Sequence, residues 1–169
     1  MIIIASQRGG ATKLAAHLLN NRDNDQVELY EISGFMSEKL DDALQEVRAQ
    51  AMGTRCNQYL FSVSLNPPET EKVETDVFEQ AISRIEERMG LQDQPRVIVF
   101  HEKEGRRHAH CVWSRIDTQE MKAVNLPFYK SKLMEISKEI YLEQGWKLPA
   151  GLIERSQSNP LNFSRAQWE

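Results

Sequence analysis

Residues 100–110 read FHEKEGRRHAH and contain three of the four histidines of the chain. Runs of β-branched and aromatic residues flank this stretch, at 96–100 before it and at 111–116 after it. The polar segment between the runs contains a glycine, as the turn of a β-hairpin commonly does. The sequence therefore predicts two antiparallel strands that are joined through residues 102–107.

The register of this hairpin brings the three histidines together. His108 and His110 are two residues apart on one strand, so their side chains leave the same face. If residues 102–107 close the hairpin, His101 lies directly opposite His108. Three neutral imidazoles with open coordination positions suit Zn²⁺, Mn²⁺ or another transition ion and indicate Lewis-acid chemistry. Cys111 points to the other face, which argues against a closed structural zinc site.

Helices and strands alternate along the rest of the chain. Amphipathic patterns predict helices at about 11–20, 36–52, 74–89 and 127–144, the last of which buries Phe128. Strand patterns occupy 1–6, 27–32 and 57–65, and the second alternates strictly, as a strand with one wet face does. This order predicts an α+β fold, with a mostly antiparallel sheet of about five strands and helices packed on it.

The composition is that of an ordinary globular protein, with 40% hydrophobic and 27% charged residues in a chain of 169. The N-terminus lacks the features of a signal peptide, and no apolar run is long enough to span a membrane. Two cysteines make no disulfide framework, so we expect buried thiols in a reducing cytoplasm. Residues 1–145 form the expected catalytic domain, and 146–169 a C-terminal lid or linker of a longer protein.

Basic residues are concentrated around the histidines, although the net charge is −4. From residue 96 to residue 132 there are eight basic and four acidic residues. A local basic surface on an acidic protein can still hold a phosphate backbone. The candidates for phosphate contacts are Lys103, Arg106, Arg107 and Arg115.

The segment from His101 to His110 resembles the three-histidine motif of the relaxases, or mobilisation nucleases. This family belongs to the histidine–hydrophobe–histidine superfamily of single-strand DNA endonucleases, and its histidine pair is His108-Ala109-His110 here. The resemblance continues through residues 57–68 and the helix at 11–20, and it covers nearly the whole chain in element order. It implies a relaxase fold and metal-dependent, strand-specific nicking of DNA at an origin of transfer, for plasmid mobilisation.

Relaxases usually carry a nucleophilic tyrosine on the helix after the first strand, and this chain departs from that pattern. In LAAHL, residues 14–18, the position that matches the family's tyrosine is His17. The resemblance to a branch with histidine there implies that His17 forms a covalent adduct with the 5′ phosphate of DNA. Glu104 matches an acidic position of the same branch, which implies that it orients or deprotonates His17. Tyr30 is the other candidate nucleophile.

The resemblance also implies a cofactor and partners. The expected metal is Mn²⁺ or Mg²⁺, with Zn²⁺ as a further possibility, and the expected partners are single-stranded origin DNA and accessory transfer proteins. One alternative is a protein that keeps the fold and binds single-stranded DNA without cutting it. The other is a metal-dependent nucleotide phosphoesterase of the histidine-triad type, which requires a histidine where the chain has Val112.

Overall fold

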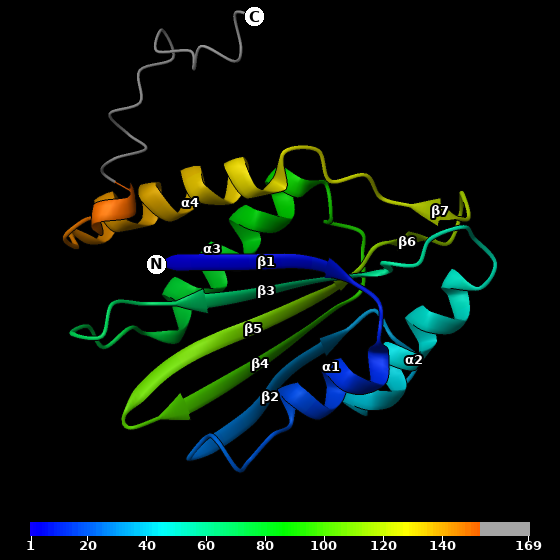
Figure 1. Cartoon of the computed structure of the whole chain (residues 1–169), viewed down its shortest axis with the longest axis horizontal. Coiled ribbons are helices and arrows are strands. Elements are labelled where there is room, and N and C mark those ends of the chain that lie inside the picture. The colour runs from blue at the N-terminus through cyan, green and yellow to red at the C-terminus, as the bar shows by residue number, and fades with distance from the viewer. Residues whose placement is uncertain (153–169) are drawn as a thin grey trace, which may run out of the picture.

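A five-stranded antiparallel sheet lies at the centre of the molecule, between two layers of helices (Figure 1). The structure is a computed structural model and describes residues 1–152 of the chain. The strand order is β1-β3-β5-β4-β2, and every neighbouring pair is antiparallel. The predicted α+β class and the five-stranded sheet are confirmed.

Each element lies close to a predicted segment. The strands of the sheet are β1 (Ile2–Arg8), β2 (Gln26–Ser33), β3 (Leu60–Asn66), β4 (Arg96–Lys103) and β5 (Arg106–Ser114). The helices are α1 (Ala11–Leu18), α2 (Leu40–Ala51), α3 (Thr75–Met89) and α4 (Tyr129–Gln144). Gly90 and Gly145 end α3 and α4 in the left-handed conformation that glycine adopts readily.

Two apolar cores lie on the two faces of the sheet. Helices α3 and α4 cover one face, which contains the fully buried Trp113 and the thiol of Cys111. Helices α1 and α2 cover the other face, where Val97, Val99 and Val112 are buried. Because side chains alternate along a strand, β4 and β5 send every second residue into each core. Burial on both faces explains why these two strands read as almost continuous apolar runs.

The β4–β5 hairpin has the predicted register and a tighter turn than predicted. His101 pairs with His108, as expected, but pairing continues to Lys103 and Arg106. Only Glu104 and Gly105 remain in the turn, and both have positive φ angles, of 53° and 74°. Two residues in this conformation match the right-handed twist of the strands that they join. The predicted six-residue connection was therefore too long. The predicted pairing of His101 with His108 is confirmed.

Strand β2 departs from the strict alternation that was predicted for it. Leu29 pairs with Val99 and Glu31 pairs with Ile98, so Tyr30 is an extra residue in a β-bulge. A bulge reverses the alternation that follows it, so Glu28 and Ile32 no longer share a face with each other. The alternation of apolar and polar residues along β2 does not indicate that a bulge lies at Tyr30.

Two predictions for the region after the hairpin were wrong. The segment between the predicted strand at 111–116 and the predicted helix at 127–144 was assigned no strand, but a small second sheet forms there from β6 (Ile116–Asp117) and β7 (Lys122–Ala123). Phe128, predicted to be buried, is 82% exposed, because it precedes α4 in a left-handed conformation with φ 55°. The predicted helix began before Phe128, so its apolar pattern assigned this side chain to the buried side of the helix.

No helix in residues 1–152 is long and apolar enough to cross a membrane. Most of the predicted lid or linker, residues 153–169, lies outside the described residues. Within the described part, Trp146 packs on Tyr141 at the end of α4. The division of the chain at residue 145 stays a prediction.

Candidate metal centre

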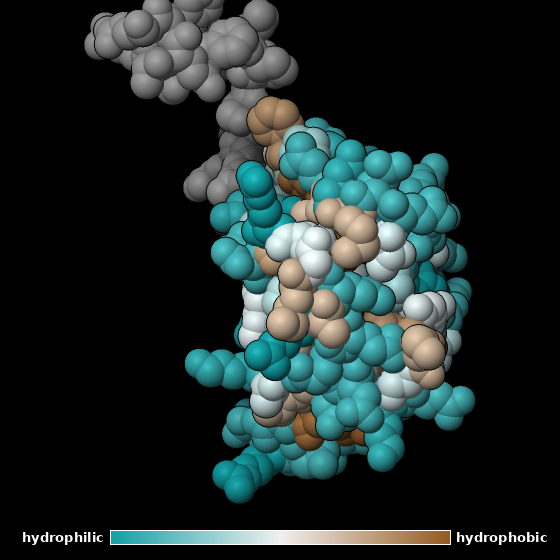
Figure 2. Space-filling view, turned by 90° about the vertical axis from the view of Figure 1, so that its right-hand side faces the viewer, coloured by the Kyte–Doolittle hydropathy of each residue, from teal (hydrophilic) through white to brown (hydrophobic). Residues whose placement is uncertain are grey.

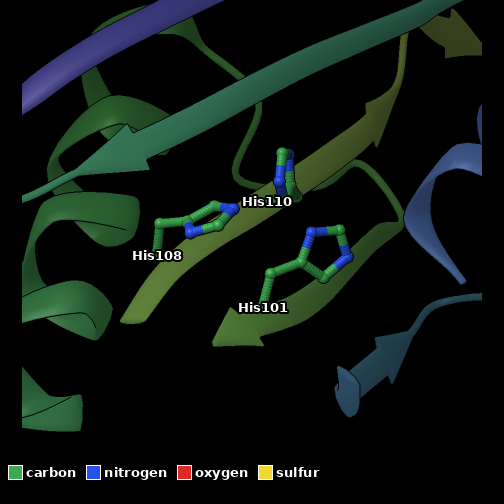
Figure 3. A group of neighbouring side chains, drawn as sticks. All are labelled: His101, His108 and His110. Atoms are coloured by element: carbon green, nitrogen blue, oxygen red, sulfur yellow. The ribbon is translucent and has the colours of Figure 1, made fainter. Parts of the chain in front are cut away.

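His101 from β4 and His108 and His110 from β5 form one cluster on the sheet face that α1 and α2 partly cover (Figure 3). Their ring centroids lie 4.5 Å apart for His101 and His110, 5.2 Å for the pair on β5, and 5.3 Å for His101 and His108. One nitrogen of each ring lies within 4.8 Å of the others. This spacing fits three ligands that converge on one divalent ion.

A backbone contact fixes the orientation of His101. This side chain is 2% exposed, and its Nε2 lies 2.6 Å from the carbonyl oxygen of Leu18, at the end of α1. Since a carbonyl only accepts, Nε2 carries the hydrogen and donates it, which leaves the Nδ1 lone pair free in the neutral ring. Such a second hydrogen bond typically sets the tautomer of a metal-binding histidine. Sequence analysis missed this group, because a backbone carbonyl has no residue-type signal.

Burial keeps the other two histidines neutral. The pKa of His110 is lowered from 6.5 to about 3, mainly by desolvation and then by the charges of the neighbouring histidines. Burial also lowers the pKa of His108, with smaller contributions from His101, Arg106 and His17. A metal binds the unprotonated nitrogen, so no proton has to be displaced from these two rings near pH 7.

His17 lies beside this cluster, on the last turn of α1. Its ring centroid is 5.8 Å from that of His110 and 6.4 Å from that of His101. The side chain of His17 is exposed. The structure thus brings all four histidines of the chain together, three on the hairpin and one on a helix that faces it.

The cluster lies at the border between covered and open parts of the sheet. In the row across the strands that contains His110, the side chains on this face belong to Val99, Ser64 and Ile4. Val99 is buried under α1 and α2, whereas Ile4 on the edge strand is 61% exposed. Ser62 and Ser6 continue the open surface in the next row. The histidines are therefore reached from the β1–β3 side, over small polar side chains.

Tyr30, the other candidate nucleophile, lies on the opposite face of the sheet. Its ring packs edge-on against Phe100, 5.2 Å between centroids, and Phe100 belongs to the core under α3 and α4. Its hydroxyl donates a hydrogen bond to Glu79 of α3, and this bond is the main cause that raises the tyrosine's pKa. The sheet separates Tyr30 from the histidines.

Two of the four basic candidates share the face of the histidines. Lys103 and Arg106 pair across the hairpin, two residue pairs beyond His101 and His108 and therefore on the same face. Arg106 also forms an exposed salt bridge of 3.0 Å with Glu69, in the loop that follows β3. Both cations are accessible and extend the histidine face towards the tip of the hairpin.

The other two have structural partners. Arg107 leaves the opposite face of β5, where its guanidinium stacks on the Phe100 ring at 3.7 Å and donates to the hydroxyl of Thr75. Arg115 is 8% exposed and donates to the carbonyl oxygens of Gln58 and Val124. Neither guanidinium is brought to the metal cluster.

Glu104 occupies the tip of the hairpin turn and is exposed. Its backbone N–H donates to the carboxylate of Asp25. Three residues of extended chain, about 10 Å, separate it from His101 along β4. The structure therefore does not bring the Glu104 carboxylate into the group of metal-ligating atoms, and its effect on His17 stays a prediction.

The family model described as relaxase, MobA/VirD2-like, nuclease domain, matches residues 17–146 of this chain. The matched region begins at His17 and includes the whole β4–β5 hairpin and α4. Comparisons with curated proteins and with solved structures gave no match.

Proposed function

The chain belongs to the relaxase family of single-strand DNA endonucleases, and we propose that His17 is its nucleophile. In this proposal His17 attacks one phosphate at an origin of transfer and remains joined to the 5′ end of the nicked strand. That would place the chain in the branch of relaxases that has a histidine in place of the tyrosine. The nick starts the mobilisation of a plasmid or a conjugative element.

The observation that carries the proposal is the position of His17 beside the three clustered histidines. A nucleophile and a metal that act on one phosphate must lie on either side of it, a few ångströms apart. Ring separations of 5.8 and 6.4 Å leave His17 near the cluster without making it part of the group of three. The exposed ring on α1 and the open β1–β3 surface also allow a strand of DNA to approach.

The residues of the cluster fit a metal ion. His101, His108 and His110 would hold it, with Nδ1 of His101 as one ligand atom. When bound, the ion would stabilise the negative charge that develops on the non-bridging oxygens of the scissile phosphate. We expect Mn²⁺ in vitro, because imidazole ligands suit it better than Mg²⁺, and Zn²⁺ as a further possibility.

The covalent step follows from the chemistry of imidazole. The unprotonated nitrogen of His17 attacks phosphorus in line with the bond to the 3′ oxygen. A P–N bond forms, the P–O3′ bond breaks, and the electron pair of that bond stays on the 3′ oxygen. The other ring nitrogen then loses its proton to solvent and the 3′ oxygen gains one, so the products are a phosphoramidate and a 3′ hydroxyl. A P–N bond of this kind is reactive enough to be reversed by a 3′ hydroxyl, as strand rejoining requires.

Of the basic candidates, Lys103 and Arg106 enter the proposal as phosphate contacts. Both side chains leave the face on which the histidines lie, and both are exposed. Arg107 and Arg115 already have protein partners, so we assign them structural roles. Glu104 enters only through its resemblance to the histidine-using branch, and we assign it no step.

The proposal extends to the setting in which the chain works. Residues 1–145 would act as the catalytic unit on cytoplasmic plasmid DNA, together with accessory transfer proteins that deliver the origin in single-stranded form.

The test is formation of a covalent adduct. The protein is mixed with Mn²⁺ and single-stranded oligonucleotides that tile the transfer origin, and adducts are separated on denaturing gels. We expect an adduct that mild acid releases, absent in His17→Ala and retained in Tyr30→Phe. An acid-stable adduct that Tyr30→Phe abolishes would overturn the assignment of His17. No adduct with Mn²⁺, Mg²⁺ or Zn²⁺ would favour a protein that binds DNA without cutting it.

A further inference from the structure

A second basic surface lies at the other end of β5, away from the hairpin tip. It is a pocket of about 1050 Å³ between the segment before β3 and the small β6–β7 sheet. Its polar and charged lining includes Arg55, Asn57, Gln58, Arg115 and Lys122. We call it the basic pocket. Figure 2 shows the side of the molecule that carries β6 and β7, where hydrophilic surface surrounds small groups of apolar side chains.

The charge of this pocket opposes that of the protein. Among the described residues that line it, three are basic and none is acidic, although the net charge of the chain is −4. Asp117 pairs with Lys122 across the β6–β7 sheet, but its carboxylate accepts backbone N–H groups of Gln119 and Glu120 in the turn. The pocket therefore favours an anionic ligand.

The buried guanidinium of Arg115 adds an independent observation. This residue is 8% exposed, and its two terminal nitrogens donate to carbonyl oxygens of Gln58 and Val124. Its Nε is buried and has no hydrogen-bond partner within the described part of the chain. With its terminal nitrogens bound to backbone carbonyls and its Nε enclosed, this guanidinium is a fixed positive charge at the wall of the pocket.

The remaining lining suits nucleotides better than an acidic peptide. Single-strand binding surfaces combine cations that follow the phosphates with apolar side chains that contact the bases. Met52 and Met121 line the pocket and are 82% and 45% exposed. The amides of Asn57 and Gln58 offer donors and acceptors to base edges.

The open surface of the sheet connects this pocket with the histidines. Ser64 lies beside His110, Ser62 follows on the same face of β3, and Gln58 comes shortly before the strand begins. Arg115 is five residues from His110, which corresponds to about 16 Å of extended chain. A stacked strand rises 3.4 Å per nucleotide, so this distance spans about five nucleotides, or fewer if the strand is extended.

We propose that the basic pocket binds the DNA strand a few nucleotides from the scissile phosphate. This inference deepens the proposed function and rests on it. Arg55 and Lys122 contact phosphates at the rim, the structural Arg115 adds fixed positive charge to the wall, and the two methionines pack on bases. The pocket would thus contribute affinity that the metal cluster does not supply.

The test measures DNA binding without nicking. The full chain in EDTA is titrated against a labelled 20-nucleotide single strand of mixed sequence at several salt concentrations. Each phosphate contact contributes about 0.7 to the slope of log affinity against log salt. We expect the double variant Arg55→Ala/Lys122→Ala to lower this slope by about 1.4. Both side chains are exposed, and thermal unfolding checks that the variant folds.

The matched control removes two lysines from α4, in Lys132→Ala/Lys138→Ala. An equal loss of slope in both double variants would mean that only net charge matters, and would overturn the proposal. An unchanged slope in the pocket variant would overturn it too, whether or not His17 forms an adduct. A further arm adds polyglutamate as competitor; competition as strong as that of unlabelled DNA at equal charge would identify the pocket as a site for acidic peptides instead.

Discussion

The two faces of the β4–β5 hairpin differ in what they do, although one sequence of alternating residues produces both. One face carries His101, His108 and His110, and the other sends Phe100 and Trp113 into the core under α3 and α4. Neighbouring residues therefore have opposite roles, and Arg106 and Arg107 are an example. In this hairpin, the face of the strand to which a side chain belongs indicates its role, whereas closeness in the sequence does not.

The largest expected contrast is between Trp113 and His110. Trp113→Ala removes a fully buried indole and its hydrogen bond to Glu86, so we expect a loss of roughly 3–5 kcal/mol in unfolding free energy. His110→Ala removes a ligand and leaves the other core intact, so Mn²⁺ affinity should fall more than about a hundredfold. Denaturant unfolding and calorimetric titration measure the two effects. If His110→Ala unfolded the protein as readily as Trp113→Ala, the two faces would not differ in role.

Acid should weaken the histidine face. The folded-state pKa of His110 is about 3, against 6.5 for the free side chain, so protonation favours the unfolded chain. This contribution to stability is complete above pH 6.5 and is lost as pH falls from 6.5 towards 3. By pH 4.5 the loss is roughly 2–3 kcal/mol.

The measurement is urea unfolding of the metal-free protein between pH 7.5 and pH 4.5. His110→Asn cannot take up this proton, so its stability should fall less steeply than that of the wild type over this interval. Equal slopes would show that desolvation of His110 does not govern the acid sensitivity.

Arg106→Ala and Arg107→Ala form the next, matched comparison. Loss of the stacking on Phe100 and of the bond to Thr75 should cost roughly 1–2 kcal/mol in Arg107→Ala. Arg106→Ala breaks an exposed salt bridge and should change stability by less than about 0.5 kcal/mol. It should instead lower the salt dependence of DNA binding by about 0.7. If Arg106→Ala lowered stability and Arg107→Ala lowered the salt dependence of DNA binding, the two arginines would not have the roles that their strand faces predict.

The smallest effect concerns the turn that joins the two faces. Glu104 has a φ of 53°, a conformation that asparagine tolerates better than glutamate. Glu104→Asn should therefore raise stability by roughly 0.5–1 kcal/mol, measured by thermal unfolding. The yield of covalent adduct is measured on the same variant. A clear drop in yield would support the predicted effect of Glu104 on His17, and an unchanged yield would contradict it.

Much of this comparison was accessible from the sequence, because strand alternation is a local rule. The rule placed the three histidines on one face and Cys111 on the other, and applied to Arg106 and Arg107 it also separates them. It failed at Tyr30, where a bulge interrupts the pairing, and at Arg115, which the predicted strand at 111–116 included but which lies beyond the end of β5.

The contacts of α1 were less accessible. A helix histidine matched to a family position could be named, but its distance from the hairpin depends on how α1 packs against β4 and β5. The Leu18 carbonyl could not be named at all, since every residue has one. Tertiary packing supplied both.

The last turn of α1 carries His17 and, one residue later, the carbonyl that holds His101. Two neighbouring peptide units therefore set both the position of the proposed nucleophile and the direction of a proposed metal ligand. One residue inserted into this turn would rotate whatever follows by about 100° and advance it by 1.5 Å. Surface loops generally tolerate changes in length, whereas we expect an insertion at this helix end to displace one of the two groups, so insertions in related nucleases should avoid it.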